Sequence, residues 1–369
     1  MHRVRVLDPW ANGEVRDRLS WYHGVLQDRK PAKFLLCKLI ACQQDPKTMT
    51  EAQLWQEHAR LRPEFSKTVA EHERGDSSPD QVQKPEFSFL DLKCELANHI
   101  LRKCIFCEWR CKVDRVKYER EGACHLNSTA RVATFFRHLG EEPPLVDRKG
   151  SGTIFFTSCS FRCVFCQNWD ISQHPDAGVA ISPAKLSLMI KSLRGEGAAN
   201  INFVGGEPTP NLHVILESLN LTSVNVPILW NSNMYLTPEA MQILSDLVDI
   251  WLPDFKWGND RCAVKYSRIV RYFAVTSRNH ATAYQNGDMI IRHLVMPGHV
   301  ECCSKPILDW VAENCPRALV NVMSQYRPEH LVLRKLGEYA EIARRPSAQE
   351  IQETRDYADR LDIVWKPIS

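Results

Sequence analysis

The chain has 369 residues, of which 44% are hydrophobic and 25% charged, and its net charge at pH 7 is +3. This composition is typical of a globular protein and excludes collagen-like and intrinsically disordered sequence. The sequence has no apolar run near the roughly 20 residues that span a bilayer, and its first residues lack the apolar stretch of a signal peptide. We therefore expect a cytoplasmic protein without a membrane partner, and the even charge balance predicts no nucleic-acid partner.

Residues 1–93 are charged and follow helical periodicity. Segments 32–43 and 50–65 have the apolar and amphipathic patterns of helices, and the polar, proline-containing run 75–85 predicts a surface connection. We expect residues 1–93 to form a helical N-terminal extension, which would serve either as an extra helical layer or as a partner-binding region.

Fourteen cysteines in a chain without a secretory signal are not expected to form a disulfide framework. Reduced thiols bind metals or lie in the hydrophobic core as small side chains. Half of the cysteines are scattered, and we expect these to be small, partly buried hydrophobic residues: Cys37, Cys42, Cys94, Cys262, Cys302, Cys303 and Cys315. The others form two compact groups, in which we expect the chemistry.

The first compact group consists of Cys104, Cys107, Cys111 and Cys124. Four thiolates complete either a tetrahedral zinc site or the ligand set of an auxiliary iron–sulfur cluster, and the spacing does not separate the two. His125 is a further potential ligand. We expect residues 94–150 to form a small metal-binding segment that ligation helps to fold.

From residue 151 onward, short apolar runs alternate with helical patterns. They predict strands at 152–157, 200–204, 226–231, 248–257, 289–298 and 318–326, and helices at 182–197, 210–219, 237–247 and 304–314. Near-continuous apolar strands indicate an α/β fold, with a parallel sheet covered by helices as in a full or partial barrel. In such folds the chemistry lies at the carboxyl ends of the strands.

The second compact group, Cys159, Cys163 and Cys166, directly follows the first of these strands. A structural zinc site normally needs four ligands, and this loop contains no histidine. Three cysteines can instead hold three irons of a [4Fe-4S] cluster, and the fourth iron keeps an open position for an outside ligand. The loop therefore predicts a cluster that takes part in chemistry.

This spacing, with the aromatic Phe165 before the third cysteine, resembles the signature of the radical S-adenosylmethionine (SAM) superfamily. The resemblance implies that residues 151–369 form a partial (β/α)6-type barrel with a C-terminal helix and strand. It implies that the open iron binds SAM, with Cys159, Cys163 and Cys166 as the catalytic cluster ligands. One electron from the cluster would cleave SAM to methionine and a 5′-deoxyadenosyl radical, which abstracts hydrogen.

Polar residues at later strand ends match the same family in order along the chain. The resemblance implies that a GGE motif contacts the amino group of SAM, two asparagines its ribose and a D-x-K strand end its carboxylate, while an arginine packs beside the cofactor. These residues are Gly205, Gly206 and Glu207; Asn231 and Asn233; Asp254 and Lys256; and Arg292. Tight turns and a solvated charge pair are the alternative interpretations of these motifs.

Residues 104–369 resemble one branch of the superfamily, proteins similar to pyruvate formate-lyase activating enzyme. This branch implies an oxidoreductase that receives electrons from a donor such as flavodoxin or ferredoxin. The sequence does not identify the substrate: a glycyl-radical protein is one candidate, although Gln167 stands where activating enzymes usually carry histidine. The alternative from another class is an iron–sulfur electron-transfer protein or a metal-stabilised binding protein without SAM turnover.

Overall fold

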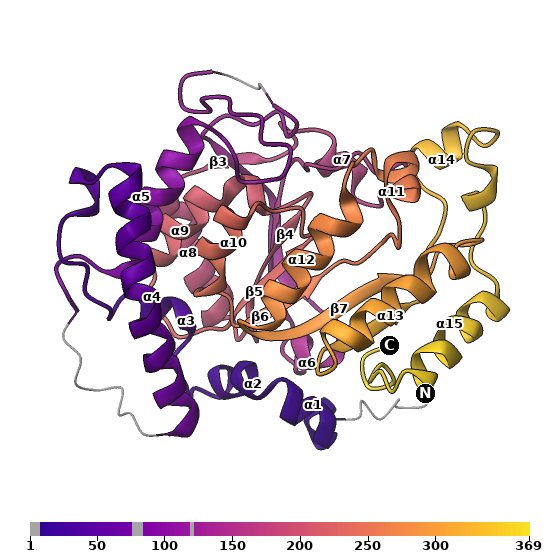
Figure 1. The fold of residues 1–369 in the computed structure, drawn as a ribbon, viewed down its shortest axis with the longest axis horizontal. Helices are drawn as coiled ribbons and strands as arrows, with labels where there is room; N and C mark the ends of the chain where they lie inside the picture. The colour runs from indigo at the N-terminus through magenta and orange to yellow at the C-terminus, as the bar shows by residue number, and fades with distance from the viewer. Residues whose placement is uncertain (1–7, 76–83, 119–121) are drawn as a thin grey trace.

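The protein has an α/β fold built around one sheet, as the sequence predicts (Figure 1). The computed structural model describes residues 8–75, 84–118 and 122–369, and within them the sheet has eight strands in the order β3-β1-β2-β4-β5-β6-β7-β8. The run from β2 to β8 is parallel. Its strands each overlap a predicted one: β2 (Ser151–Phe156), β4 (Ile201–Gly205), β5 (Ile228–Ser232), β6 (Ile250–Pro253), β7 (Asp288–Leu294) and β8 (Leu319–Met323).

Two further strands, β1 (Ala130–His138) and β3 (Val179–Ile181), extend the sheet antiparallel beyond β2. Neither strand was predicted from the sequence. The pairing of β1 with β2 shifts register between Val132 and Thr134, so the two-residue alternation that reveals a strand is interrupted. The second half of β1 is also largely exposed, which removes its apolar signal.

Helices cover the outer face of the sheet and alternate with the strands (Figure 1). α8 begins as predicted, because the Ser182 side chain accepts a hydrogen bond from the Lys185 backbone N–H at 3.3 Å and Pro183 occupies the first turn. The helices of this region are α6 (Pro143–Val146), α7 (Trp169–Ser172), α8 (Pro183–Gly195), α9 (Leu212–Asn220), α10 (Pro238–Ser245), α11 (Asp260–Ser267), α12 (Tyr272–Tyr284), α13 (Lys305–Asn314), α14 (Leu331–Arg334) and α15 (Ala348–Arg360).

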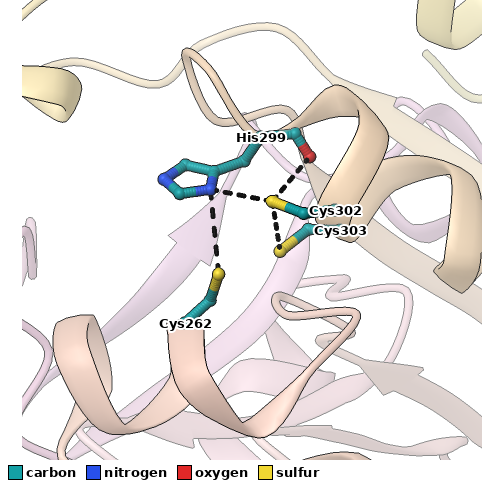
Figure 2. Close-up of side chains that lie close together, drawn as sticks. All are labelled: Cys262, His299, Cys302 and Cys303. Atoms are coloured by element: carbon teal, nitrogen blue, oxygen red, sulfur yellow. Dashed lines mark hydrogen bonds between the residues drawn. The ribbon is translucent and has the colours of Figure 1, made fainter.

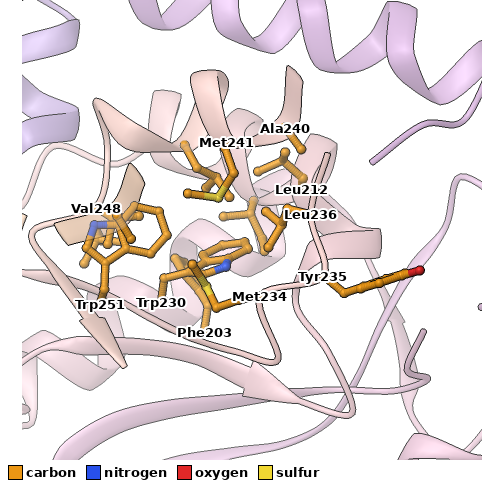
Figure 3. Close-up of a cluster of buried hydrophobic side chains, with 14 of the residues drawn as sticks. Phe203, Leu212, Trp230, Met234, Tyr235, Leu236, Ala240, Met241, Val248 and Trp251 are labelled. Carbon is orange, nitrogen blue, oxygen red and sulfur yellow. The ribbon is translucent and has the colours of Figure 1, made fainter. Parts of the chain in front are cut away.

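The central parallel strands are buried on both faces, because successive side chains alternate between two layers. Trp230 of β5 and Trp251 of β6 belong to the core under the helices, where they lie close to Met241 of α10 (Figure 3). Their sequence neighbours Leu229 and Ile250 belong to a second core on the inner face of the sheet. Burial on both faces explains why these strands read as continuous apolar runs.

The N-terminal helices α1 (Gly13–Arg18) and α2 (Ser20–Leu26) close the amino end of this inner face. Two carboxylates, the buried Asp249 and the half-buried Asp288, fix the contact. Asp249 accepts a hydrogen bond from the Trp21 indole, and Asp288 accepts one from the Tyr22 N–H, both at 2.8 Å. The apolar side chains that meet there are Trp10, Val15, Leu19, Tyr22 and Leu26 with Leu229, Ile250, Leu252, Ile290 and Leu319. The carboxyl ends of the strands remain as the open end of the barrel.

The helices α3 (Lys33–Cys37), α4 (Glu51–Arg74) and α5 (Phe89–Arg102) form a further layer, in which α5 packs on α9 and α10 (Figure 1). This confirms the helical N-terminal extension. α5 runs across residue 93, and the division of the chain into parts at residues 93 and 150 stays a prediction. The connection predicted at 75–85 lies largely outside the described residues. Among the described helices, none combines the length and the apolar character that crossing a bilayer requires.

A buried ion pair attaches this layer to the barrel. The Lys93 ammonium of α5 lies 2.7 Å from the Asp246 carboxylate that follows α10, and both side chains are almost fully buried. Lys93 also donates to the His58 imidazole at 2.9 Å and to the Ile243 carbonyl at 3.1 Å. Burial and the neighbouring Lys93 charge lower the pKa of His58 to about 2, so this imidazole stays neutral and accepts the hydrogen bond.

The outer edge of β8 is covered by the C-terminal segment. The Val320 N–H donates to the Val364 carbonyl at 3.1 Å, and the Val322 N–H donates to the Ser369 hydroxyl at 2.7 Å. At the other edge of the sheet, β3 has only three residues. The β8 edge of the sheet is therefore covered by hydrogen bonds, and the β3 edge offers only a short strand for pairing.

The turn after β4 passes so close to β2 that it has room only for glycine. A Cβ atom on Gly206 would lie 1.9 Å from the Ser158 carbonyl oxygen, and one on Gly205 would lie 2.1 Å from the Phe156 carbonyl oxygen. Gly205 also has a φ of 128°, which side chains disfavour. These glycines therefore serve the protein's own packing at the site where the sequence predicts a cofactor.

We expect Lys93→Met to lower the free energy of unfolding by about 3–5 kcal/mol, because it leaves the buried Asp246 carboxylate without its closest cation. Urea unfolding of the anaerobically reconstituted protein measures the change. Lys67→Met is the matched control, since that ammonium is exposed and lies 3.9 Å from Glu71; it should change stability by about 0.5 kcal/mol or less. Equal effects of the two substitutions would contradict the role of the buried pair.

We expect Gly206→Ala to destabilise the protein by about 1–3 kcal/mol, because the new methyl group must displace the Ser158 backbone. Gly195→Ala is its control, since the last residue of α8 has open space around its Cα. The control should leave the urea midpoint unchanged or raise it slightly, because alanine favours helix. A Gly206→Ala protein as stable as the control would show that this turn is not tightly packed.

Candidate functional site

A cavity of about 260 Å³ lies at the carboxyl ends of the parallel strands. It is also bordered by residues that the sequence analysis did not single out, among them Ser172, Ser232 and Gln325. The barrel residues that the sequence predicts as cluster ligands or SAM contacts all line this cavity: Cys159, Cys163, Phe165, Cys166, Gly205, Gly206, Glu207, Asn231, Asn233, Asp254, Lys256 and Arg292. The fold thus brings them together, while the role of each stays a prediction.

The cysteine loop (residues 159–166) is held in place by its neighbours. The Arg162 backbone N–H donates to the Ser267 carbonyl at 3.1 Å, which fastens the loop to the end of α11. The Arg162 guanidinium donates to the carbonyls of Cys159 and Ala123, at 2.6 and 2.7 Å. The position of the loop therefore depends on α11 and on the segment that carries the other cysteine group.

Polar side chains surround the three sulfur atoms of the cysteine loop. Hydrogen bonds to cluster sulfurs are one of the means by which proteins adjust iron–sulfur potentials. The polar side chains that contact the sulfurs are the Asn233 amide, 3.7 Å from Cys159; the Ser267 hydroxyl, 3.1 Å from Cys163; and the Ser172 hydroxyl, 3.2 Å from Cys166.

Burial raises the pKa of each thiol in this loop, that of Cys163 to about 12 and that of Cys159 well above its ordinary value. The thiolates also repel one another, which adds to the effect. Three adjacent thiolates are therefore unfavourable here without a cation. Iron ions would supply that positive charge, so this donor set fits an iron–sulfur cluster.

The Glu207 carboxylate is buried and engaged by the protein itself. One oxygen accepts hydrogen bonds from the Thr209 and Ser232 hydroxyls at 2.6 and 2.7 Å, and the other accepts from the Asn233 N–H at 3.0 Å. Burial raises the pKa of this carboxyl group. The carboxylate thus ties the end of β4 to the end of β5, and its contact with the amino group of SAM stays a prediction.

Asp254 and Lys256 form an ion pair on the cavity wall, just beyond β6. Burial disfavours the Lys256 ammonium, but the Asp254 carboxylate outweighs that effect and raises its pKa. Lys256 is therefore protonated at neutral pH, and it can bind an anionic group that enters the cavity.

Arg292 of β7 is held by two glutamates that the sequence analysis did not predict. Its guanidinium donates to both oxygens of Glu142, at 2.8 and 2.9 Å, and it also pairs with Glu141. The Asn321 amide donates to the same Glu142 carboxylate at 2.8 Å. The glutamates lie 150 residues or more before Arg292 in the chain, so no local sequence pattern connects them with it.

The four-cysteine group of residues 104–124 lies in an irregular segment between α5 and β1. Burial raises the pKa of Cys107 well above its ordinary value, and the neighbouring thiolates raise it further. The buried Arg115 guanidinium lies 3.8 Å from the Cys104 sulfur and donates to the Pro210 carbonyl, in the turn after β4, at 2.8 Å. The segment therefore contacts the cavity's own loops.

Three of the scattered cysteines are not isolated, which corrects the expectation from the sequence. Cys262 of α11 lies beside Cys302 and Cys303 in the π-helical turn Val300–Ser304, and His299 completes the group. Cys262 lies 37 residues before His299 in the sequence, so no local spacing pattern predicts that these residues are neighbours. The remaining scattered cysteines are buried, as expected: Cys37, Cys42, Cys94 and Cys315.

Two solved structures can be aligned with the chain at low similarity. SuiB of Streptococcus suis, bound to the precursor peptide SuiA, is 13% identical, with 57% of this chain and 46% of that chain covered and a TM-score of 0.42. The chain thus spans less than half the length of SuiB. TYW1 with a lysine-pyruvate adduct bound is 13% identical, with 60% and 75% covered and a TM-score of 0.37. Similarity at this level carries no functional information.

Two other comparisons identify the family. Residues 153–311, which hold the cysteine loop and most of the cavity wall, match the Radical SAM superfamily. The uncharacterized protein MJ0674 of Methanocaldococcus jannaschii is 40% identical over 356 residues, which cover 94% of this chain and 99% of that protein. Together with the three-cysteine loop at the open end of the barrel, these matches show that the chain belongs to the radical SAM superfamily.

Proposed function

We propose that the protein cleaves SAM reductively at a [4Fe-4S] cluster held by Cys159, Cys163 and Cys166, and abstracts hydrogen from a substrate at the open end of the barrel. The observation that carries the proposal is the single cavity shared by the three thiols and the predicted SAM contacts. Bound there, the cluster supplies the electron that splits the sulfonium into methionine and a 5′-deoxyadenosyl radical.

The chain's own residues are suited to bind and orient SAM. Lys256 offers an ammonium for its carboxylate, and the amides of Asn231 and Asn233 offer donors and acceptors for its ribose hydroxyls. Phe165 packs edge-to-face on Trp257, with ring centroids 5.7 Å apart. This aromatic contact excludes water from one side of the cysteine loop, which protects a cluster from hydrolysis and oxidants.

The size of the cavity favours a substrate that reaches in from outside. Its volume of about 260 Å³ is below the roughly 300–1,000 Å³ of pockets that enclose a drug-sized ligand. The cluster and SAM together would fill this space, so the reacting group of the substrate enters through the mouth of the barrel. A loop of a protein, such as a glycyl-radical protein, meets this requirement. A flavodoxin or ferredoxin is the electron donor that we propose.

We also propose that Cys104, Cys107, Cys111 and Cys124 hold a metal centre, either zinc or a second iron–sulfur cluster. The crowding of buried thiols around Cys107 supports this, because they need a cation to ionise together. The Arg115 guanidinium beside Cys104 supplies one positive charge but no coordination.

We expect Cys163→Ala to abolish reductant-dependent formation of 5′-deoxyadenosine, because the cluster loses one of its three ligands. Mass spectrometry of the products measures this after anaerobic reconstitution with iron and sulfide. Cys94→Ala is the matched control, since Cys94 is a buried thiol of α5 that does not border the cavity; it should retain cleavage. Cleavage by Cys163→Ala at the control's rate would contradict the assignment.

The same anaerobic preparation distinguishes the proposed enzyme from the alternative, an iron–sulfur electron-transfer protein without SAM turnover. A wild-type protein with a fully loaded, reducible cluster that neither binds nor cleaves SAM would be an electron-transfer protein. Binding of SAM without cleavage would instead indicate that turnover requires the substrate, and the proposed function would stand. Equilibrium dialysis with labelled SAM distinguishes these two outcomes.

We expect Cys104→Ala to lower the thermal unfolding midpoint and to leave the radical SAM cluster in the protein that remains folded. Elemental analysis of the wild type should give about four irons if this segment holds zinc, or about eight irons if it holds a second cluster. Cys42→Ala is the control for removal of a buried thiol outside both groups. Loss of iron from the cysteine loop in folded Cys104→Ala protein would show that the two centres depend on each other.

A further inference from the structure

Cys262, His299, Cys302 and Cys303 form a compact group away from the cavity (Figure 2). Their ligand atoms, three sulfurs and one imidazole nitrogen, all lie within 4.8 Å of one another. In the described ranges 8–75, 84–118 and 122–369, this is the one group of three or more potential ligands with that property. Three of the four residues are buried and Cys302 is half-buried.

The spacing of the ligand atoms fits one tetrahedral ion. Zinc–sulfur bonds of about 2.3 Å and zinc–nitrogen bonds of about 2.0 Å place tetrahedral sulfurs about 3.8 Å apart, and sulfur and nitrogen about 3.5 Å apart. The sulfurs of Cys302 and Cys303 are 3.8 Å apart, and the His299 Nδ1 atom lies 3.2 Å from Cys302 and 3.8 Å from Cys262. These three distances are close to those of a tetrahedral site, and the other three pairs of ligand atoms also lie within 4.8 Å of each other.

From this geometry we propose that Cys262, His299, Cys302 and Cys303 bind one zinc ion in a structural site. Three thiolates and one imidazole are a complete ligand set for a closed zinc site. An iron–sulfur cluster fits less well, because each iron of a cluster takes its own cysteine, and the cysteines stand apart around the cluster core. The direct contact between the sulfurs of Cys302 and Cys303 favours a single ion.

The surroundings of the group stabilise thiolates and fix the histidine. The Asn259 amide donates to the Cys302 carbonyl at 2.7 Å and to the Cys303 sulfur at 3.6 Å. The His299 ring stands edge-on to the rings of Trp257 and Tyr266, with centroids 5.8 and 5.2 Å away. The Asn259 hydrogen bonds are of the kind that orient metal ligands. The second ring nitrogen of His299, Nε2, is buried and has no hydrogen-bond partner among the described residues.

The site would join two loops at the open end of the barrel. Cys262 belongs to α11, which follows β6, and the other three ligands belong to the turn that follows β7. α11 ends at Ser267, which holds the cysteine loop through the Arg162 N–H. A zinc ion here would therefore fix α11, the helix that binds the cysteine loop. The four ligands do not line the cavity, so this ion would not contact SAM or the cluster.

Metal analysis of the purified full-length protein tests the proposal. We expect Cys262→Ala to contain about one zinc per chain less than the wild type and the same amount of iron. Cys315→Ala removes a buried thiol at the end of α13 and should retain the wild-type zinc content. Any zinc bound by the four-cysteine segment is present in both wild type and variant, so it cancels in the difference between their zinc contents. Equal zinc in wild type and Cys262→Ala would overturn the proposal.

A second variant covers the case in which Cys262→Ala does not fold. His299→Cys keeps four ligands and should keep its zinc. After exchange with Co²⁺, its thiolate-to-metal charge-transfer absorption should exceed that of the wild type by the contribution of one thiolate, as three thiolates at this site become four. An unchanged Co²⁺ spectrum would overturn the proposal. So would a disulfide among Cys262, Cys302 and Cys303 in zinc-free protein purified without oxygen, which would indicate a redox pair.

Discussion

Burial of the parallel strands on both faces is the constraint on which the site depends. Side chains two positions apart share a face, so the inward row of each strand passes from the amino end to the carboxyl end of the barrel. The amino half of this row is apolar and is covered by α1 and α2, whereas the carboxyl half is polar. The pairs are Leu229 and Asn231 on β5, Leu252 and Asp254 at β6, and Ile290 and Arg292 on β7. The cavity is the part of the barrel interior that the N-terminal helices do not fill.

Much of this arrangement could be predicted from the sequence, because it rests on local signals. The apolar runs predicted the six parallel strands. The strand ends and the spacing of Cys159, Cys163 and Cys166 predicted residues that line one cavity. What the sequence could not show depends on contacts between distant segments. Glu142 meets Arg292 across 150 residues, and Cys262 meets Cys302 only because the loops after β6 and β7 are neighbours. A register shift and exposure hid β1.

The interior residues of the cavity also depend on one another electrostatically. Lys256 is balanced by Asp254, and Arg292 is balanced by Glu141 and Glu142. The protein's own pairs thus nearly neutralise the polar half of the barrel before any ligand binds. By contrast, the three thiols of the cysteine loop share the charge of Lys256, which is already paired with Asp254 and offsets only part of the rise that burial causes in the pKa of Cys163 and Cys166. This difference separates the polar cavity wall, whose charges are paired within the protein, from the cysteine loop, to which we assign the cluster.

The covering of β8 by the C-terminal segment has a consequence for how this protein behaves at high concentration. An open sheet leaves a row of unpaired N–H and C=O groups at each margin, and such rows recruit strands from other molecules. Here the Val320 and Val322 N–H groups are occupied by Val364 and Ser369. The residues after α15 therefore protect the β8 edge from pairing with a strand of another molecule, and they lie outside the cavity lining. Replacing them would change colloidal behaviour before it changed the cavity.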